Sequence, residues 1–324
     1  MKNDSLKKIG DKILEYDNIL IITHILGDGD TLGSAAALCQ AVREQGKNAW
    51  IMIEDKVPEY LKFLVVDMCV EELPFKGNYI SVAVDCSDME RFPERRKIFR
   101  SGEICINIDH HLTNTFFGDY NYVEPDSAAT AEIIYLLLKA MKIEISKEAA
   151  EKIYAGINTD TGKFQNANTT ARSHKIVSEL YKTGIDHITV GIKLFQSVKP
   201  EKLMLENKII GNIQMFHDGR GACTVVTQKM LEETGTLMED TEGIVEILRS
   251  LDGVEISVFL KEMGEEEVKV SMRAKKEADV SKISSLFGGG GHVKAAGCTI
   301  NKDISEAKEM ILREVEKELE MIYG

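Results

Sequence analysis

The sequence predicts an α/β protein in which a doubly wound parallel sheet is followed by a smaller α+β C-terminal domain. Apolar, β-branched runs, typical of strands buried on both faces, alternate with segments of helical periodicity, which indicates a parallel sheet. The runs lie at 18–23, 48–58, 79–85 and 104–109, and the helical segments at 31–46, 126–143 and 146–159. Beyond residue 205 the pattern changes to short strands, with an alternating stretch at 254–275 that is typical of an antiparallel hairpin.

We expect one domain at 1–190 and a second at 206–324, joined by a connector at 191–205. Pro200 marks the connector, because the residue before a proline is biased away from helix. With 44% hydrophobic residues, the 324-residue chain can bury a sizeable core. Its apolar runs fall short of the roughly 20 residues of a membrane span, and the N-terminus lacks a signal-type apolar core. A cytoplasmic protein without a membrane partner is therefore expected.

The charge of the chain bears on its partners. The formal net charge is −13, from 53 acidic and 40 basic residues, which argues against a long nucleic-acid track and favours a short substrate. One cluster at 91–100 interleaves basic residues with Phe92 and Phe99, a pattern that can follow single-stranded nucleic acid. A solvated helix face is the favoured interpretation of this cluster, and its role stays open.

Side chains that bind metals follow the predicted strands. In open α/β sheets the carboxyl ends of the strands form one edge where sites develop, and the helix that we expect to start near Gly33 points its positive end there. Asp160 is expected just beyond a helix, in a turn rich in Thr and Gly. The side chains in question are His24, Asp28, Asp30, Asp85, Asp109, His110, His111 and Asp160.

The types of these side chains indicate the chemistry. Carboxylates and imidazoles with no cysteine among them suit Mn²⁺ or Mg²⁺ better than structural zinc, and they exceed the needs of one ion. The six cysteines show no C-x-x-C spacing, so no disulfide or zinc site is assigned. Two divalent ions activate water and stabilise charge on a phosphoryl group, which predicts phosphoester hydrolysis.

The order and spacing of these motifs, followed by the distal GGGGH at 288–292, resemble the DHH phosphoesterase superfamily. Length, the helix DSAATAE at 126–132 and the Gly-rich domain resemble its nanoRNase type, whose members degrade oligoribonucleotides and remove the 3′-phosphate of pAp. The resemblance implies two metal ions, with Mn²⁺ favoured over Mg²⁺. Leu26-Gly27 departs from the polar residue and proline frequent there, which affects the stiffness of the loop more than ligation.

The resemblance also implies roles for residues. One metal would be held by His24 and Asp28, the other by Asp30, His110 and Asp160, and Asp85 would bridge them. His111 would contact the scissile phosphate, and Asp109 would orient an imidazole. The active site would lie in the inter-domain cleft, and the terminal phosphate and base of the substrate would be bound by Arg273, the loop Gly288, Gly289, Gly290 and Gly291, and His292.

Several alternatives stay open. The substrates could be short RNA, short DNA, linear dinucleotides such as pApA, cyclic dinucleotides or pAp, and the chain could be a monomer or a dimer. A family II inorganic pyrophosphatase resembles the first domain but lacks GGGGH. A RecJ-like single-strand exonuclease is disfavoured by the negative charge. A nucleotide-sensing module without hydrolysis would not need all of the metal-binding side chains. The Gly-rich run could also be a hinge or a tight turn.

Overall fold

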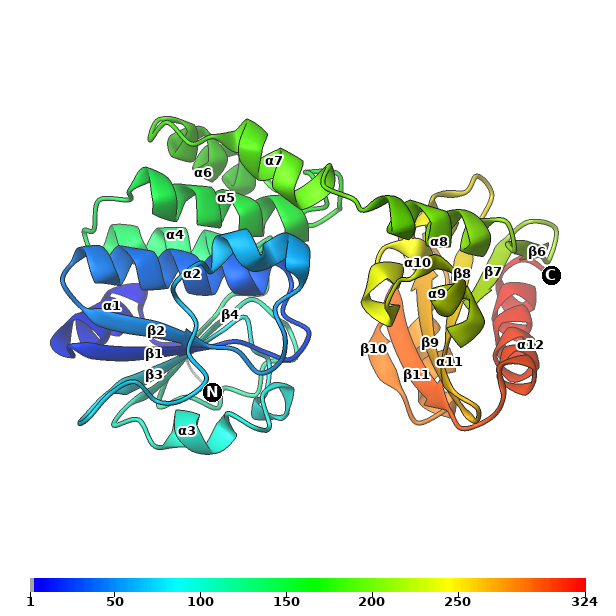
Figure 1. The fold of residues 1–324 in the computed structure, drawn as a ribbon, viewed down its shortest axis with the longest axis horizontal. Helices are drawn as coiled ribbons and strands as arrows, with labels where there is room; N and C mark the ends of the chain where they lie inside the picture. The colour runs from blue at the N-terminus through cyan, green and yellow to red at the C-terminus, as the bar shows by residue number, and fades with distance from the viewer. Residues whose placement is uncertain (1–2) are drawn as a thin grey trace. The chain divides into compact units, whose positions relative to one another are not determined.

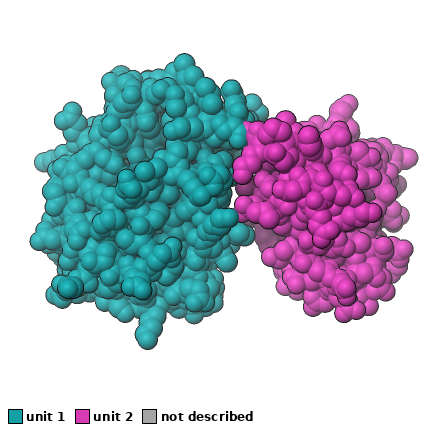
Figure 2. Space-filling model, in the orientation of Figure 1, with its two compact units in different colours: residues 1–197 teal, residues 198–324 magenta. Residues whose placement is uncertain are grey.

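The computed structural model describes residues 3–324 and divides the chain into two compact units, with the boundary between Ser197 and Val198 (Figure 2). The predicted connector at 191–205 includes the last residues of α7 (His187–Phe195) and the first residues of α8 (Pro200–Ile210). Leu205 of α8 is fully buried in the core of the second unit. Within residues 3–324, no helix is long and apolar enough to cross a membrane.

The first unit contains a five-stranded sheet in the order β2-β1-β3-β4-β5, and all of its neighbouring strands are parallel. The strands are β1 (Asn18–Ile22), β2 (Asn48–Met52), β3 (Ile80–Val84), β4 (Cys105–Asp109) and β5 (Tyr120–Val123). The parallel sheet confirms the prediction, but β5 was missed because it is a short edge strand. Backbone and side-chain groups of Asn3 and Asp4 pair with β5 and cover that edge.

Helices cover both faces of the sheet (Figure 1), as a doubly wound fold requires. Ile19 and Ile21 of β1 face the core beneath the larger helical layer, whereas Leu20 and Ile22 face a second core that contains Phe92. The larger layer comprises α1 (Leu6–Glu15), α2 (Gly29–Glu44), α4 (Thr130–Ala140), α5 (Lys147–Asp160), α6 (Ala171–Tyr181) and α7. The other face is covered by the short α3 (Arg96–Arg100) and the loops beside it.

The order of the strands positions the site. From β1 the chain moves to β2 on one side, and β3 then lies on the other side of β1. The chain therefore continues to opposite sides from β1 and from β3. In doubly wound sheets, such a switch point forms a crevice at the carboxyl ends of the two strands. The residues that follow β1 and β3 lie at this edge of the sheet.

Three local predictions were wrong. Helix α2 begins at Gly29 and not near Gly33, because the Asp28 side chain accepts from two backbone N–H groups and caps the helix one turn earlier. The helix expected from residue 126 onward, α4, begins only at Thr130, with Ala129 as its N-cap. Asp160 is the last residue of α5 and does not lie beyond it.

The second unit is α+β, as predicted. Its six-stranded sheet has the order β10-β11-β9-β8-β7-β6, and β8 and β9 form the predicted hairpin. The strands are β6 (Gln214–Phe216), β7 (Gly221–Val226), β8 (Ile256–Gly264), β9 (Glu267–Ala274), β10 (Gly290–His292) and β11 (Ala295–Ile300). The helices are α8, α9 (Gln228–Thr234), α10 (Ile244–Ser250), α11 (Val280–Leu286) and α12 (Ile304–Tyr323).

Candidate metal centre

Metal-binding side chains converge at the carboxyl edge of the parallel sheet. Three groups each place their candidate ligand atoms within 4.8 Å of one another. The groups are His24, Asp28 and Asp85; Asp30, His110 and Asp160; and Asp85, His110 and His111. Asp85 belongs to two groups and His110 to two, so the three groups are one connected cluster. The first two groups contain the ligand sets that the sequence analysis predicted, whose role in metal binding stays a prediction.

Asp85 lies at the centre of the cluster, directly after β3. Its backbone φ of +59° is rare for a non-glycine residue, and such strain often occurs at functional sites. The buried carboxylate accepts hydrogen bonds from Thr31 Oγ1 at 2.6 Å and Thr130 Oγ1 at 2.8 Å. Burial acts to raise its pKa, but the neighbouring imidazoles outweigh burial and hold the pKa of Asp85 well below its usual value.

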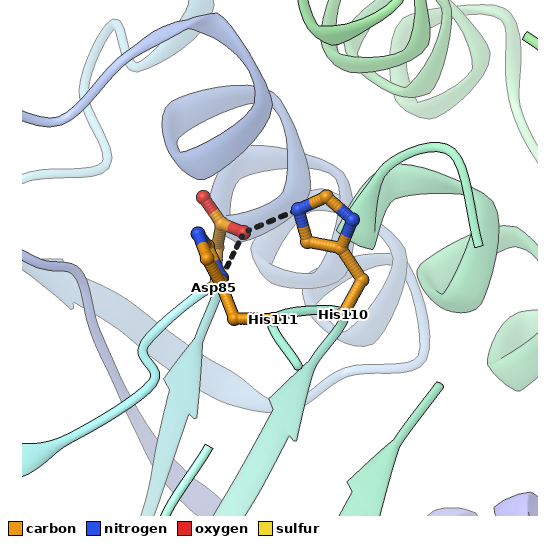
Figure 3. Close-up of side chains that lie close together, drawn as sticks. All are labelled: Asp85, His110 and His111. Atoms are coloured by element: carbon orange, nitrogen blue, oxygen red, sulfur yellow. Dashed lines mark ion pairs between the residues drawn. The ribbon is translucent and has the colours of Figure 1, made fainter. Parts of the chain in front are cut away.

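Two imidazoles approach the same oxygen of Asp85 (Figure 3). His110 Nε2 lies 3.6 Å and His111 Nδ1 3.7 Å from Oδ1. On the other oxygen, His24 Nε2 lies 3.5 Å from Oδ2. One carboxylate thus has an imidazole beside each of its oxygens, which suits a ligand shared between two ions.

Hydrogen bonds on the far side of two rings determine which nitrogen is left to bind a metal. His24 Nδ1 lies 2.6 Å from the carbonyl of Ile25, and His110 Nδ1 lies 3.1 Å from the carbonyl of Ser127. A carbonyl only accepts, so Nδ1 carries a proton in each ring, and Nε2, on the side of the carboxylates, is the nitrogen that can bind a metal ion once it has lost its own proton. This arrangement fits divalent ions.

Asp109 is fully buried and orients His111. Its Oδ1 accepts from His111 Nδ1 at 2.7 Å, and its Oδ2 accepts from the Asn114 amide at 2.6 Å. Burial acts to lower the pKa of His111, but Asp109 and then Asp85 outweigh it and raise that pKa. Asn114 was missed by the sequence analysis, although it lies only three residues after His111.

Two carboxylates of the cluster have raised pKa values. Burial, and then the charges of Asp85 and Asp160, raise the pKa of Asp30 well above its usual value. Burial and the charge of Asp85 raise the pKa of Asp160 to about 7, against the opposing effect of His110. Burial lowers the pKa of His110, but nearby carboxylates outweigh it and raise that pKa to about 9. This concentration of negative charge favours bound cations.

A close helix crossing brings Asp30 and Asp160 together. An added Cβ at Gly33 of α2 would lie 2.7 Å from the carbonyl oxygen of Lys152, and one at Gly156 of α5 would lie 2.9 Å from Asp30 Oδ1. Only glycine allows such an approach between the two backbones. Asp30 near the start of α2 can therefore share a site with Asp160 at the end of α5.

Polar residues outside the predicted set hold the ligands. Gly162, Lys163 and Phe164 all have positive φ, and this left-handed turn begins two residues after Asp160. Asn168 Nδ2 donates to Asp160 Oδ2 at 3.3 Å.

Arg172 donates to Ser127 Oγ at 2.9 Å and forms an ion pair with the fully buried Glu132 at 3.0 Å. These contacts anchor the segment whose carbonyl bonds His110. Residues of these types are common in loops and helices, so the sequence analysis could not single out most of them. Only Ser127 and Glu132 lie in a motif that it named, DSAATAE.

The predicted substrate-binding residues belong to the second unit. His292 pairs with Ala295, which pairs with Arg273, so these three residues form one row across β10, β11 and β9 and share a face of the sheet. Arg273 also lines a cavity of about 290 Å³ and donates to Glu246 at 3.0 Å. Gly290 and Gly291 are in β10, whereas Gly288 and Gly289 form the turn before it.

The glycines of GGGGH differ in what surrounds them. Gly289 and Gly291 pack against neighbouring backbone, where an added Cβ would lie 2.3 Å from the Gly297 carbonyl and 2.5 Å from the Ala295 carbonyl. An added Cβ on Gly290 meets nothing within 4 Å. Two of the glycines are thus needed for packing, and their part in binding an anion stays a prediction.

Comparison with known proteins identifies relatives along most of the chain. The DHH family, N-terminal domain, matches residues 18–157, and the DHHA1 domain matches residues 222–321. A Thermus thermophilus protein named bifunctional oligoribonuclease and PAP phosphatase NrnA is 35% identical over 306 residues, which cover 93% of this chain and 90% of the relative.

Two solved structures share the fold. An exopolyphosphatase-related protein from Bacteroides fragilis has a TM-score of 0.86 and 26% identity, and the match covers 96% of each chain. RecJ from T. thermophilus, in complex with Mn²⁺, has a TM-score of 0.55 at 14% identity and covers 96% of this chain and 54% of that one. The family matches to both units and the near full-length relative show that this chain belongs to the DHH family.

Proposed function

We propose that this protein is a metal-dependent phosphoesterase that hydrolyses short oligonucleotides, including linear dinucleotides such as pApA, to mononucleotides and dephosphorylates pAp to AMP. The observation that carries the proposal is the shared position of Asp85 between two groups of carboxylates and imidazoles. The name of the T. thermophilus relative, which aligns over 93% of the chain, supports the choice of substrates.

The residues of the cluster fit two divalent ions, with Mn²⁺ favoured and Mg²⁺ as the alternative. His24 and Asp28 would hold one ion, Asp30, His110 and Asp160 the other, and Asp85 both. Bound there, the ions would activate water and stabilise charge on the phosphoryl group. A RecJ structure of the same fold contains Mn²⁺, which supports the choice of ion.

The remaining residues would orient the substrate and move protons. His111 donates its Nδ1 proton to Asp109, which directs Nε2 away from that carboxylate. The raised pKa of His111 favours the imidazolium, so Nε2–H would donate a hydrogen bond to an oxygen of the scissile phosphate. Thr31 and Thr130 would keep the two oxygens of Asp85 in place.

The second unit would bind the far end of the substrate. Arg273 and His292 lie on one face of its sheet and carry groups that bind phosphate and stack on a base. Binding energy from this remote part would position the reacting bond at the metals.

The proposal is tested with the purified full-length chain and Mn²⁺, assayed against pAp, pApA, pyrophosphate, and RNA and DNA of graded length. We expect release of phosphate from pAp and fastest cleavage of substrates a few nucleotides long. Cleavage of pyrophosphate alone would support a family II pyrophosphatase, and preference for long strands a RecJ-like exonuclease. Binding of nucleotides without turnover would support a sensing module.

A further inference from the structure

The basic cluster at 91–100 is not a track for nucleic acid, because the structure uses most of it elsewhere. Phe92 and Phe99 are fully buried, pack edge-on against each other at 5.4 Å between ring centroids, and cannot stack on bases. Arg95 donates to the carbonyls of Ile53 and Glu71, and Arg96 pairs with Glu90 at 2.6 Å.

Arg91 differs from the other basic residues of this cluster because it lies beside the metal centre. Its exposed guanidinium lies beside the metal centre, with Nη2 at 3.2 Å from His24 Nδ1. Since His24 Nδ1 already donates to the Ile25 carbonyl, this contact offers Arg91 no good acceptor. Within residues 3–324, the structure gives the Arg91 side chain no carboxylate partner. Its donors are thus available to a ligand.

The backbone holds Arg91 at this place. The N–H of Ile25, in the loop after β1, donates to the carbonyl of Arg91 at 2.7 Å. Asp88 caps the short 3₁₀ helix Met89–Arg91, and Thr115 Oγ1 donates to Asp88 at 2.8 Å. One imidazole ring separates the guanidinium from the Asp85 carboxylate, which lies 3.5 Å from Nε2 of that ring. Arg91 is therefore fixed to the loop that carries His24.

The charge of the site favours a positively charged side chain at the position of Arg91. The four carboxylates assigned as ligands, Asp28, Asp30, Asp85 and Asp160, balance two divalent ions, and the whole chain is strongly acidic. A phosphate with one or two negative charges thus gains little net attraction from ions and ligands together. An unpaired guanidinium supplies positive charge and a fork of donors that matches phosphate oxygens.

We propose that Arg91 binds the phosphate that is cleaved at the metal centre, an inference that rests on the proposed phosphoesterase function. It differs from Arg273 and His292 because it belongs to the unit that contains the metal ligands. Arg91 should therefore matter for every substrate, including a small chromogenic diester such as bis(p-nitrophenyl) phosphate, which has neither a base nor a terminal phosphate for Arg273 and His292 to bind.

The test compares Arg91→Ala and Arg91→Lys with Lys97→Ala, which removes the same charge from an exposed position of the same cluster. Calorimetric titration of Mg²⁺-loaded protein with inorganic phosphate should show at least about tenfold weaker binding for Arg91→Ala and wild-type binding for Lys97→Ala. Arg91→Lys should be intermediate, because it keeps the charge and loses the fork. kcat/KM for pAp and for the small diester should fall by a similar factor.

Binding of Mn²⁺, followed by electron paramagnetic resonance, separates phosphate binding from a structural role. We expect Arg91→Ala to bind Mn²⁺ as the wild type does. Unchanged phosphate affinity in Arg91→Ala, or a loss that accompanies weaker Mn²⁺ binding, would overturn the inference. If the wild type binds phosphate through Arg91 but cleaves none of the substrates, the proposed function fails and the anion site stands.

Discussion

The carboxylate of Asp30 caps helix α4, whose first residue, Thr130, lies a hundred residues further along the chain. Its Oδ2 accepts from the Thr130 N–H at 2.7 Å, and its Oδ1 accepts from the Ala131 N–H at 2.9 Å. Ala129, the N-cap, has no side chain that could serve these groups. Because Thr130 Oγ1 also donates to Asp85, this cap connects two predicted ligands through α4.

Asp30→Ala should destabilise the metal-free protein, since it leaves two buried N–H groups without acceptors, at a cost of about 1–3 kcal/mol each. The change also removes the repulsion from Asp85 and Asp160 that helps to raise the pKa of Asp30, so the measured loss is the net of the two effects. Urea unfolding at pH 6 with a chelator measures the effect. An unchanged unfolding free energy would show that the cap has no energetic role.

Asp85→Asn should retain the fold and lose activity by at least about a thousandfold, the scale seen when a key electrostatic group is removed. Asparagine tolerates the positive φ of this position and still accepts one hydrogen bond, but it cannot bridge two ions as a carboxylate does. Turnover of pAp and circular dichroism check the variant. Near-normal turnover in folded protein would contradict a shared role for Asp85.

The metal-free protein should lose stability as the pH rises from 6 to 9. The raised pKa of His110, about 9, contributes stability that is complete below its unfolded value of 6.5 and lost as the pH passes 9. Asp160, with a raised pKa of about 7, favours the folded state only while it keeps its proton. Urea unfolding with a chelator at pH 6, 7.5 and 9 measures this, with His110→Asn as the control.

Binding of Mn²⁺ should strengthen over the same range, because the ion displaces protons from Asp160 and His110. Calorimetry in two buffers of different ionisation enthalpy counts those protons. A pH-independent affinity without proton release would mean that these residues are not ligands.

Gly33→Ala should disturb the crossing of α2 and α5, because its Cβ would lie 2.7 Å from the carbonyl oxygen of Lys152. We expect a loss of about 1–3 kcal/mol, as in other overpacked cores, and weaker Mn²⁺ binding as Asp30 moves from Asp160. Gly191→Ala in α7, where a Cβ meets nothing within 4 Å, is the control and should stabilise by about 0.5–1 kcal/mol. Equal effects of the two changes on unfolding would refute the packing argument.

His292→Ala and Arg273→Ala should each reduce kcat/KM for pAp and pApA by roughly tenfold or more and leave bis(p-nitrophenyl) phosphate nearly unaffected. His292 is exposed, so its truncation removes little packing. Rates on both substrate types and the melting temperature are measured for each variant. Parallel loss of both rates and of thermal stability would mean that GGGGH is only a tight turn.

The sequence by itself determined the parallel sheet, the second α+β domain and the side chains that gather in the candidate metal centre. It could do so because a buried strand has a continuous apolar run that ends sharply, so His24, Asp85 and His110 are visible as polar groups at strand ends. Parallel strands share one carboxyl edge, so positions along the chain already imply proximity in space.

Only the tertiary structure decided which side chains hold the predicted ligands in place. Thr31 and Thr130 hold Asp85 through hydrogen bonds between segments far apart in the chain. Asn114 and Ser127 bond Asp109 and His110 from nearer segments, and no periodicity marks any of these contacts. The cluster at 91–100 is a second example. Its composition does not predict that Phe92 is buried in the core while Arg91 lies against His24. A side chain's surroundings depend on which segments pack beside it, and that is a property of the folded chain alone.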